Sequence, residues 1–268
     1  MAQALRPYPH VLTVNSNEDK LGSSIYHAFE AKVQKRFASG LQYLVSYTYS
    51  KSITDVNDVL SGLTSSSLQN AGNRRAARAI SGSDTPQTFW LSTIYELPFG
   101  RGRRYLQSGV ADKILGGWNI SGILSYQSGV PLAVTQSNRL AIFNSGQRPD
   151  RVLGVDARNS ISYGDYDPAI DRLFNPDAFT QAQTDAFGNA AARLSDARGL
   201  GLRREDLNLG KMTYLTEGVS LEFTTQIFNL FNRNQWGRAE PNTSSSNFGK
   251  VSRAGPGRFV QFGLRLRF

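Results

Sequence analysis

The chain has 268 residues, a formal net charge of +9, two histidines and no cysteine. The missing cysteine excludes disulfides, zinc ribbons and thiol nucleophiles, and no stretch approaches the roughly 18–20 consecutive apolar residues of a membrane-spanning helix. A mean hydropathy of −0.36 argues against a helical membrane protein but not against a membrane β-barrel, whose strands are apolar on one face only.

The N-terminal part of the chain predicts a β-hairpin. A short strand at residues 11–14 and a polar loop at 15–24 come first. Apolar and polar side chains then alternate over residues 27–36, and again over residues 41–50. Residues 38–40, Ala-Ser-Gly, predict a tight turn between these two strands. The hairpin has an aromatic-rich face, expected outside, and a hydrophilic face, expected inside.

The middle of the chain predicts two further strands. Residues 51–86 lack periodicity and are rich in Ser, Asn, Gly and Arg, a length of irregular chain that compact soluble domains seldom tolerate without a function. Residues 88–97 form the next strand, although Trp90 and Ile94 interrupt its polar side. A connection follows, and residues 118–127 alternate clearly.

The C-terminal half repeats this organisation. Residues 137–204 are long, polar and punctuated by glycine, and a strand begins with the alternation at residues 206–209. A turn near residues 216–218 leads to a strand at 219–227, and residues 233–257 form a loop before the last strand.

The last ten residues, 259–268, alternate strictly. One face carries Val260, Phe262, Leu264, Leu266 and Phe268, and the other carries Gln261, Gly263, Arg265 and Arg267. A transmembrane β-strand needs about 9–11 residues of this kind. Taken alone, the segment also fits a half-buried edge strand of a soluble sandwich, so the assignment depends on its repetition along the chain.

About eight such strands are predicted, and short connections alternate with long ones. This predicts an all-β, antiparallel, up-and-down transmembrane β-barrel with long extracellular loops and the C-terminus at the short-turn, periplasmic end. Aromatic residues lie near the strand ends, where interfacial girdles would need them: Phe37, Tyr43, Tyr49, Tyr95, Phe99, Trp118, Tyr126 and Phe268.

Seven stretches carry a family resemblance in order along the chain: LRPYP at residues 5–9, YHAFEAKVQKRF at 26–37, SYTYSKS at 46–52, YELPFGRGRR at 95–104, GGWNISG at 116–122, IFNLFN at 227–232 and PGRFVQFGL at 256–264. They resemble the C-terminal barrel region of TonB-dependent outer-membrane receptors, especially the Oar-like type with a carboxypeptidase-regulatory domain.

The resemblance implies a receptor of about twenty-two strands around a plugged lumen, located in the outer membrane of a Gram-negative bacterium and driven by TonB–ExbB–ExbD. Residues 1–268 would supply the C-terminal part of its barrel wall, an open partial barrel, for uptake of an unknown ligand; the plug and earlier strands would lie outside this chain. The first nine residues have no apolar core of a secretory signal, so we expect the chain to be part of a longer gene product.

The resemblance also implies that the terminal strand is the signal read by the barrel-assembly machinery. The residues that would carry this signal are Phe262, Leu264, Leu266 and Phe268.

Binding chemistry is expected on the inward face and in the long loops. The lumen-facing candidates are Glu30, Lys32, Gln34, Arg36, Glu222, Gln226, Arg265 and Arg267. The alternative is that they pair with each other or with a plug, because unpaired charges away from water are costly. Residues 51–86 and 137–204 are better candidates for ligand capture, and apolar pairs at 173–174 and 178–179 could anchor the second loop.

No enzyme, cofactor or metal site is predicted. Two histidines leave little scope for acid–base catalysis, and the chain has neither a G-x-S-x-G motif nor any other triad signature.

Two other interpretations stay open. Eight strands can close into a self-contained barrel, which would require pairing between residues 11–14 and 259–268. A soluble basic β-protein that binds polyanions is the other, but the basic residues are dispersed and form no nucleic-acid motif. The expected partners are therefore outer-membrane lipid, the barrel-assembly machinery and, in the parent protein, the plug and TonB–ExbB–ExbD, without nucleic acid.

Overall fold

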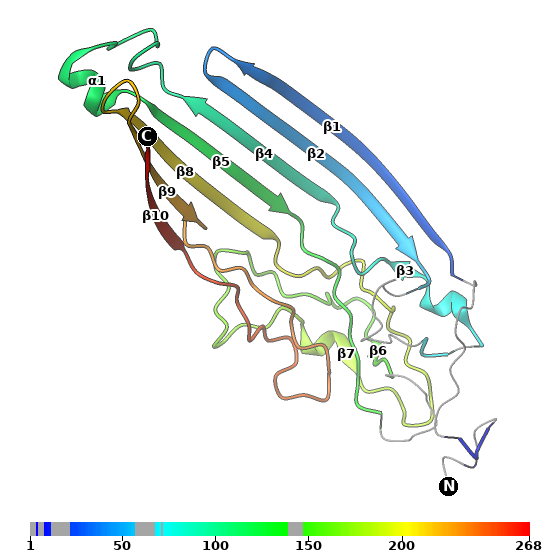
Figure 1. The fold of residues 1–268 in the computed structure, drawn as a ribbon. Coiled ribbons are helices and arrows are strands. Elements are labelled where there is room, and N and C mark those ends of the chain that lie inside the picture. Colours follow the sequence, from blue (N-terminus) through cyan, green and yellow to red (C-terminus); the bar gives the residue numbers. More distant parts are fainter. Residues whose placement is uncertain (1–3, 5–7, 12–21, 57–67, 71, 139–146) are drawn as a thin grey trace.

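The strands of the chain form one antiparallel meander. The computed structural model describes residues 4, 8–11, 22–56, 68–70, 72–138 and 147–268. Over these residues an eight-stranded sheet has the order β1-β2-β4-β5-β8-β9-β10, and the short strand β3 pairs with β2. Figure 1 shows these strands side by side, from β1 at one margin to β10 at the other. The predicted all-β, up-and-down fold is confirmed.

Seven long strands carry this sheet, each antiparallel to the next along the chain: β1 Ser24–Ala38, β2 Leu41–Thr54, β4 Gln87–Glu96, β5 Trp118–Gln127, β8 Leu202–Tyr214, β9 Ser220–Phe228 and β10 Phe259–Arg267. Each of them contains or overlaps a segment with the predicted two-residue alternation. The strand predicted at residues 11–14 lies, apart from Val11, outside the described residues.

The β1–β2 turn is as tight as predicted. Ser39 and Gly40 have φ angles of 55° and 80°, the positive values that a two-residue hairpin turn of the primed type requires. Gly40 also lies against the backbone of β4, because a Cβ atom there would come within 2.8 Å of the Glu96 carbonyl oxygen.

Strand β8 begins earlier than predicted. Residues up to 204 were expected in a loop, but the backbone pairs with β5 from Leu202 onward, so Glu205 lies opposite Leu124. The first residues of the strand are charged one after another, so the sequence shows no alternation of apolar and polar side chains there. Local partners offset the charges, since Arg204 Nε donates to Asp206 Oδ2 at 2.8 Å.

The short elements lie in the connections: α1 Gly109–Leu115, β3 Ala79–Ile80, β6 Asp150–Arg151, β7 Phe179–Thr180, and 3₁₀ helices at Arg74–Ala77 and Pro176–Ala178. Helix α1 was not expected, and a distant residue stabilises it. Lys211 Nζ on β8 donates to the carbonyl oxygens of Ile114 at 2.7 Å and Gly116 at 3.0 Å, so a cation satisfies the free carbonyls at the C-terminus of the helix.

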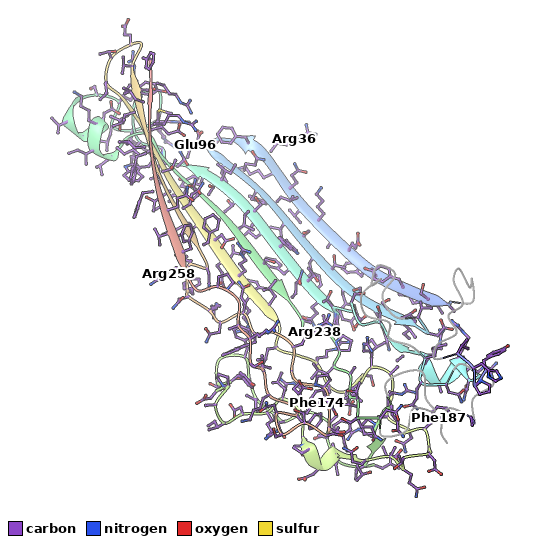
Figure 2. The ribbon with its side chains drawn as sticks, turned by 60° about the horizontal axis from the view of Figure 1, so that its bottom comes forward. Arg36, Glu96, Phe174, Phe187, Arg238 and Arg258 are labelled. Carbon is purple, nitrogen blue, oxygen red and sulfur yellow. The ribbon has the colours of Figure 1, made fainter. Side chains whose placement is uncertain are left out.

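The hydrophobic core lies beyond the strand ends, not under the sheet. We call the described residues of 128–138, 147–201 and 229–258 the loop cap. Phe174 stacks on Phe248 with ring centroids 5.0 Å apart, and Phe179 packs edge-on against both; Figure 2 shows Phe174 within this region. The other buried core residues are Leu132, Val134, Ala157, Tyr166, Leu173, Ala178, Ala190, Leu194, Ala197, Ala239 and Val251.

The cap is also tied to the end of β2. Arg198 Nη2 donates to Asp84 Oδ2 at 2.6 Å, and the other carboxylate oxygen of Asp84 accepts from the Ser52 backbone N–H at 2.6 Å. The apolar pairs at residues 173–174 and 178–179 lie in the core, so these segments anchor the long loop as expected.

The sheet is open. Among the described residues β1 pairs only with β2, and β10 pairs only with β9. The C-terminus lies beside α1 at the short-turn end, and the long connections lie at the other end (Figure 1). Both the open partial barrel and the predicted position of the C-terminus agree with this arrangement.

Candidate functional site

Strand pairing assigns side chains to two faces of the sheet. Residues opposite each other on antiparallel strands point to the same side. Followed from strand to strand, the register places Gln34 on β1, Gln226 on β9 and Gln261 on β10 on one side of the sheet. We call this side the polar face. It holds seven predicted site residues: Glu30, Lys32, Gln34, Glu222, Gln226, Arg265 and Arg267. The register of β1 shifts between Lys35 and Ala38, so pairing does not assign the eighth, Arg36.

The opposite side, the apolar face, has aromatic residues at both ends of β4 and β5 and smaller, mostly aliphatic residues between them. Strand β5 presents Trp118, Ile120, Gly122, Leu124 and Tyr126 there, and β4 presents Phe89, Leu91, Thr93 and Tyr95. From Trp118 to Tyr126 the strand rises about 26 Å at 3.3 Å per residue. At the tilt of about 40° that barrel strands adopt, this length covers roughly 20 Å of membrane depth, of the same order as the apolar band of about 25 Å on outer-membrane barrels.

Three predicted residues meet on the polar face near the short-turn end. Arg267 Nη2 donates to Glu222 Oε2 at 2.5 Å, and Arg265 Nη1 lies 4.0 Å from the same oxygen. The two arginines on β10 therefore share one carboxylate on β9. Charges on this face pair with each other here, which was the alternative considered for these residues.

The candidates on β1 lie at the other margin of the sheet. Glu30, Lys32 and Gln34 are exposed, and β1 and β10 are the two edges of the described sheet. The structure therefore does not bring the β1 group together with the Glu222 cluster.

The polar face also carries an apolar hollow. Ile94, Ile123 and Phe228 line a depression of about 310 Å³ together with Ser121 and Asn208. The interruption that Ile94 makes in the alternation of its strand is therefore part of a larger apolar surface assembled from three strands.

The apolar face contains a buried carboxylate that the sequence analysis missed. The Glu205 residue is 2% exposed, its Oε1 accepts from the Tyr126 hydroxyl at 2.9 Å, and Arg233 Nε lies 3.0 and 3.2 Å from its two oxygens. A signal was present, because Glu205 has the parity of Leu207 and Leu209, and a carboxylate on an apolar face needs a partner.

A hollow of about 680 Å³ opens beside this carboxylate at the long-loop end of the apolar face. The Arg203 guanidinium lies 5.0 Å from the Tyr163 ring centroid, a cation–π arrangement. Burial raises the pKa of the Tyr163 phenol, and its hydroxyl donates to the Asn234 carbonyl oxygen. The side chains that line the hollow are Tyr47, Gln87, Phe89, Tyr126, Tyr163, Arg203 and Arg233.

Comparison with known proteins identifies the family. A family model described as "Outer membrane beta barrel domain" matches residues 1–261. The chain belongs to this family. This outer-membrane β-barrel domain is therefore located in the outer membrane.

Two further comparisons say less about the relatives of this chain. A comparison with the curated proteins finds no match. Among solved structures, P. aeruginosa FpvA bound to heterologous pyoverdines is similar at 12% identity with a TM-score of 0.38, over 91% of this chain and 19% of that chain. The chain thus spans about a fifth of the length of that protein.

The loops predicted to capture ligand are only partly described in this β-barrel domain. Residues 57–67, 71 and 139–146 lie outside the described residues, and residues 147–201 belong to the loop cap. In the described part of the chain, no three His, Cys, Asp or Glu side chains gather as a metal site would require. The described helices include none that is long and apolar enough to cross a membrane.

Proposed function

We propose that this chain is part of the barrel wall of a TonB-dependent outer-membrane receptor of the Oar-like type, which takes up a ligand. The observation that carries the proposal is the open meander, in which β1 and β10 have no second neighbour among the described residues. Unpaired backbone N–H and C=O groups cost several kcal/mol each in hydrocarbon, so membrane sheets close. Further strands of a larger barrel would pair with both edges.

In this proposal the apolar face contacts lipid and the polar face lines the lumen. Support comes from the aromatic–aliphatic–aromatic order on β4 and β5, and from the pairing of Glu222 with Arg265 and Arg267 on the other side. Glu30, Lys32, Gln34, Arg36 and Gln226 would line the same lumen. Their role is to bind or to guide the ligand or the plug, not to catalyse a reaction.

The last strand has a second proposed role, as the signal read by the barrel-assembly machinery. Leu264 is 70% exposed and Phe268 is 99% exposed, so the apolar groups of the strand are open to recognition. Phe262 and Leu266 share the face of Leu264. In the parent protein, the further partners would be a plug and TonB–ExbB–ExbD.

Disulfide trapping tests whether the wall belongs to a larger barrel. Residues 1–268 contain no cysteine, and any cysteine elsewhere in the reading frame is changed to serine, so that the introduced pair carries the only two thiols. The protein is expressed from its full reading frame in a Gram-negative host, with Val33→Cys on β1 combined in turn with Phe262→Cys, Leu264→Cys and Leu266→Cys on β10. The control is Leu221→Cys with Leu266→Cys, which lie opposite each other on β9 and β10.

We expect a disulfide in the control pair and in none of the β1–β10 pairs, because other strands would separate these edges. Efficient β1–β10 disulfides in outer membranes would instead establish a self-contained small barrel. Recovery of the protein in the soluble fraction would contradict both and would favour a soluble polyanion-binding protein.

A further inference from the structure

The hollow beside Glu205 lies at the long-loop limit of the apolar face. Tyr47, Phe89, Tyr126 and Arg203 form a single row across β2, β4, β5 and β8, because each lies opposite the next in the register. Phe89 and Tyr126 stack with centroids 6.1 Å apart. The row is thus a run of aromatic rings on three strands that ends in a guanidinium group on β8.

Two arginines in this hollow have donors to spare. In the described part of the chain, the Arg203 guanidinium makes no ion pair or hydrogen bond and rests on the Tyr163 ring. Arg233 uses its Nε on Glu205, and neither of its Nη atoms has a hydrogen-bond partner among the described residues. Two cations against one carboxylate leave a net charge of +1 beside an aromatic wall.

A pair of arginines with free donors is suited to bind a phosphate group. Guanidinium is planar, weakly hydrated and able to offer two parallel N–H donors, so it is favoured where phosphate is bound. The anchor of Arg233 on a buried carboxylate fixes its orientation in advance, which lowers the entropy lost on binding.

The surface next to the hollow is apolar. One step toward the short-turn end, Val45, Leu91 and Leu124 form the next row on the same face. A ligand seated at the two arginines would therefore continue along an aliphatic surface. This combination fits an amphiphile with an anionic headgroup better than a small water-soluble anion.

We propose that this hollow binds the phosphate-bearing saccharide headgroup of an outer-leaflet glycolipid. Arg203 and Arg233 hold the phosphate, the aromatic row packs against the sugar rings, and the acyl chains follow the aliphatic rows. The proposal rests on the assignment of the apolar face to lipid in the proposed function. It adds a defined lipid site at the outer rim of the wall, next to the loop cap.

The test compares two neighbouring arginines. Arg203→Gln removes a cation from the hollow, and Arg204→Gln makes the same change on the opposite face, where the side chain pairs with Asp206. The full-length protein is reconstituted in nanodiscs of phosphatidylcholine doped with lipid A or with lipid A stripped of its phosphates. Bound glycolipid per protein is measured by native mass spectrometry, and inorganic phosphate is tested as a competitor.

We expect Arg203→Gln to lower lipid A binding about tenfold, the loss of one charge-assisted hydrogen-bonding group, with Arg204→Gln within about twofold of wild type. Dephosphorylated lipid should bind weakly to all three proteins, and millimolar phosphate should not displace lipid A.

Equal lipid A binding by wild type and Arg203→Gln would overturn the site, and so would equal binding of the two lipids by wild type. Displacement by free phosphate would assign the hollow to a soluble anion. A loss confined to Arg204→Gln would show that the polar face contacts lipid, which refutes the proposed facing itself. Outer-membrane insertion of all three proteins, measured in parallel, tests the barrel assignment separately.

Discussion

Arg233 in the β9–β10 connection donates through Nε to both carboxylate oxygens of Glu205 on β8, at 3.0 and 3.2 Å. The two residues are 28 positions apart, and the Glu205 side chain is 3% exposed. Tyr126 on β5 donates to the same carboxylate at 2.9 Å. A loop residue and two strands are therefore joined at one buried charge, where the sheet passes into the loop cap.

Removal of the arginine should destabilise this junction. Arg233→Leu leaves the Glu205 carboxylate buried and unpaired, which costs about 3–5 kcal/mol. Denaturant unfolding of the detergent-solubilised full protein measures the loss. The control is Arg258→Leu, an exposed arginine of the same connection (Figure 2), for which we expect less than about 1 kcal/mol.

A double variant separates the charge from the packing. Glu205→Leu with Arg233→Leu should recover most of the lost stability, since replacement of a buried pair by apolar residues is often neutral. A double variant as unstable as Arg233→Leu alone would mean that the buried charge is not the cause.

The facing of β10 predicts unequal effects of neighbouring substitutions. Leu264→Arg places a charge on the proposed lipid face, which costs about 2–4 kcal/mol at the bilayer midplane and less toward the interfaces. Arg265→Leu removes one of two arginines that share Glu222. We expect several-fold less folded, heat-modifiable protein in outer membranes for Leu264→Arg and a near-normal amount for Arg265→Leu. Equal yields would contradict the facing.

The open sheet predicts that a polypeptide of these 268 residues aggregates in water. Both edge strands expose backbone donors and acceptors, and the apolar face is broad. Light scattering during refolding should show aggregates in plain buffer and fewer in detergent micelles. A monodisperse, cooperatively folded monomer without detergent would refute the prediction.

The loop cap should depend on its own aromatic core. Phe174→Ala removes the ring at the centre of the Phe174–Phe179–Phe248 cluster and should cost about 3–5 kcal/mol. Phe187→Ala, at an exposed position of the same cap and also labelled in Figure 2, is the matched control. Limited proteolysis of intact cells should cleave the cap of the first variant several-fold faster.

The barrel itself should be unaffected by this change, because the core lies beyond the strand ends. Heat modifiability of Phe174→Ala should therefore equal that of wild type. A loss of the folded barrel form together with the cap would show that the two fold as one unit.

Most of the sheet could be predicted from the sequence. Alternation with a period of two is a local property of an extended chain, so residues 27–36, 118–127 and 259–268 showed their strands without a partner. The same local reasoning applied to Ser39 and Gly40, whose turn needs only the backbone freedom of those positions. The alternation of short and long connections then implied a meander, which the pairing of each long strand with its chain neighbour confirms.

The rest of the fold depends on contacts between distant segments, which no local sequence pattern shows. The first residues of β8 are charged. Only backbone pairing with β5 and the ion pair with Arg233 offset the cost of burying the Glu205 carboxylate in a strand. Helix α1 has only seven residues, and Lys211 of strand β8 stabilises its C-terminus. Thus the sequence by itself determined the strand order and the two faces, because side-chain alternation is geometry. The tertiary structure alone decided the cap and the buried carboxylate, because burial depends on where distant segments meet.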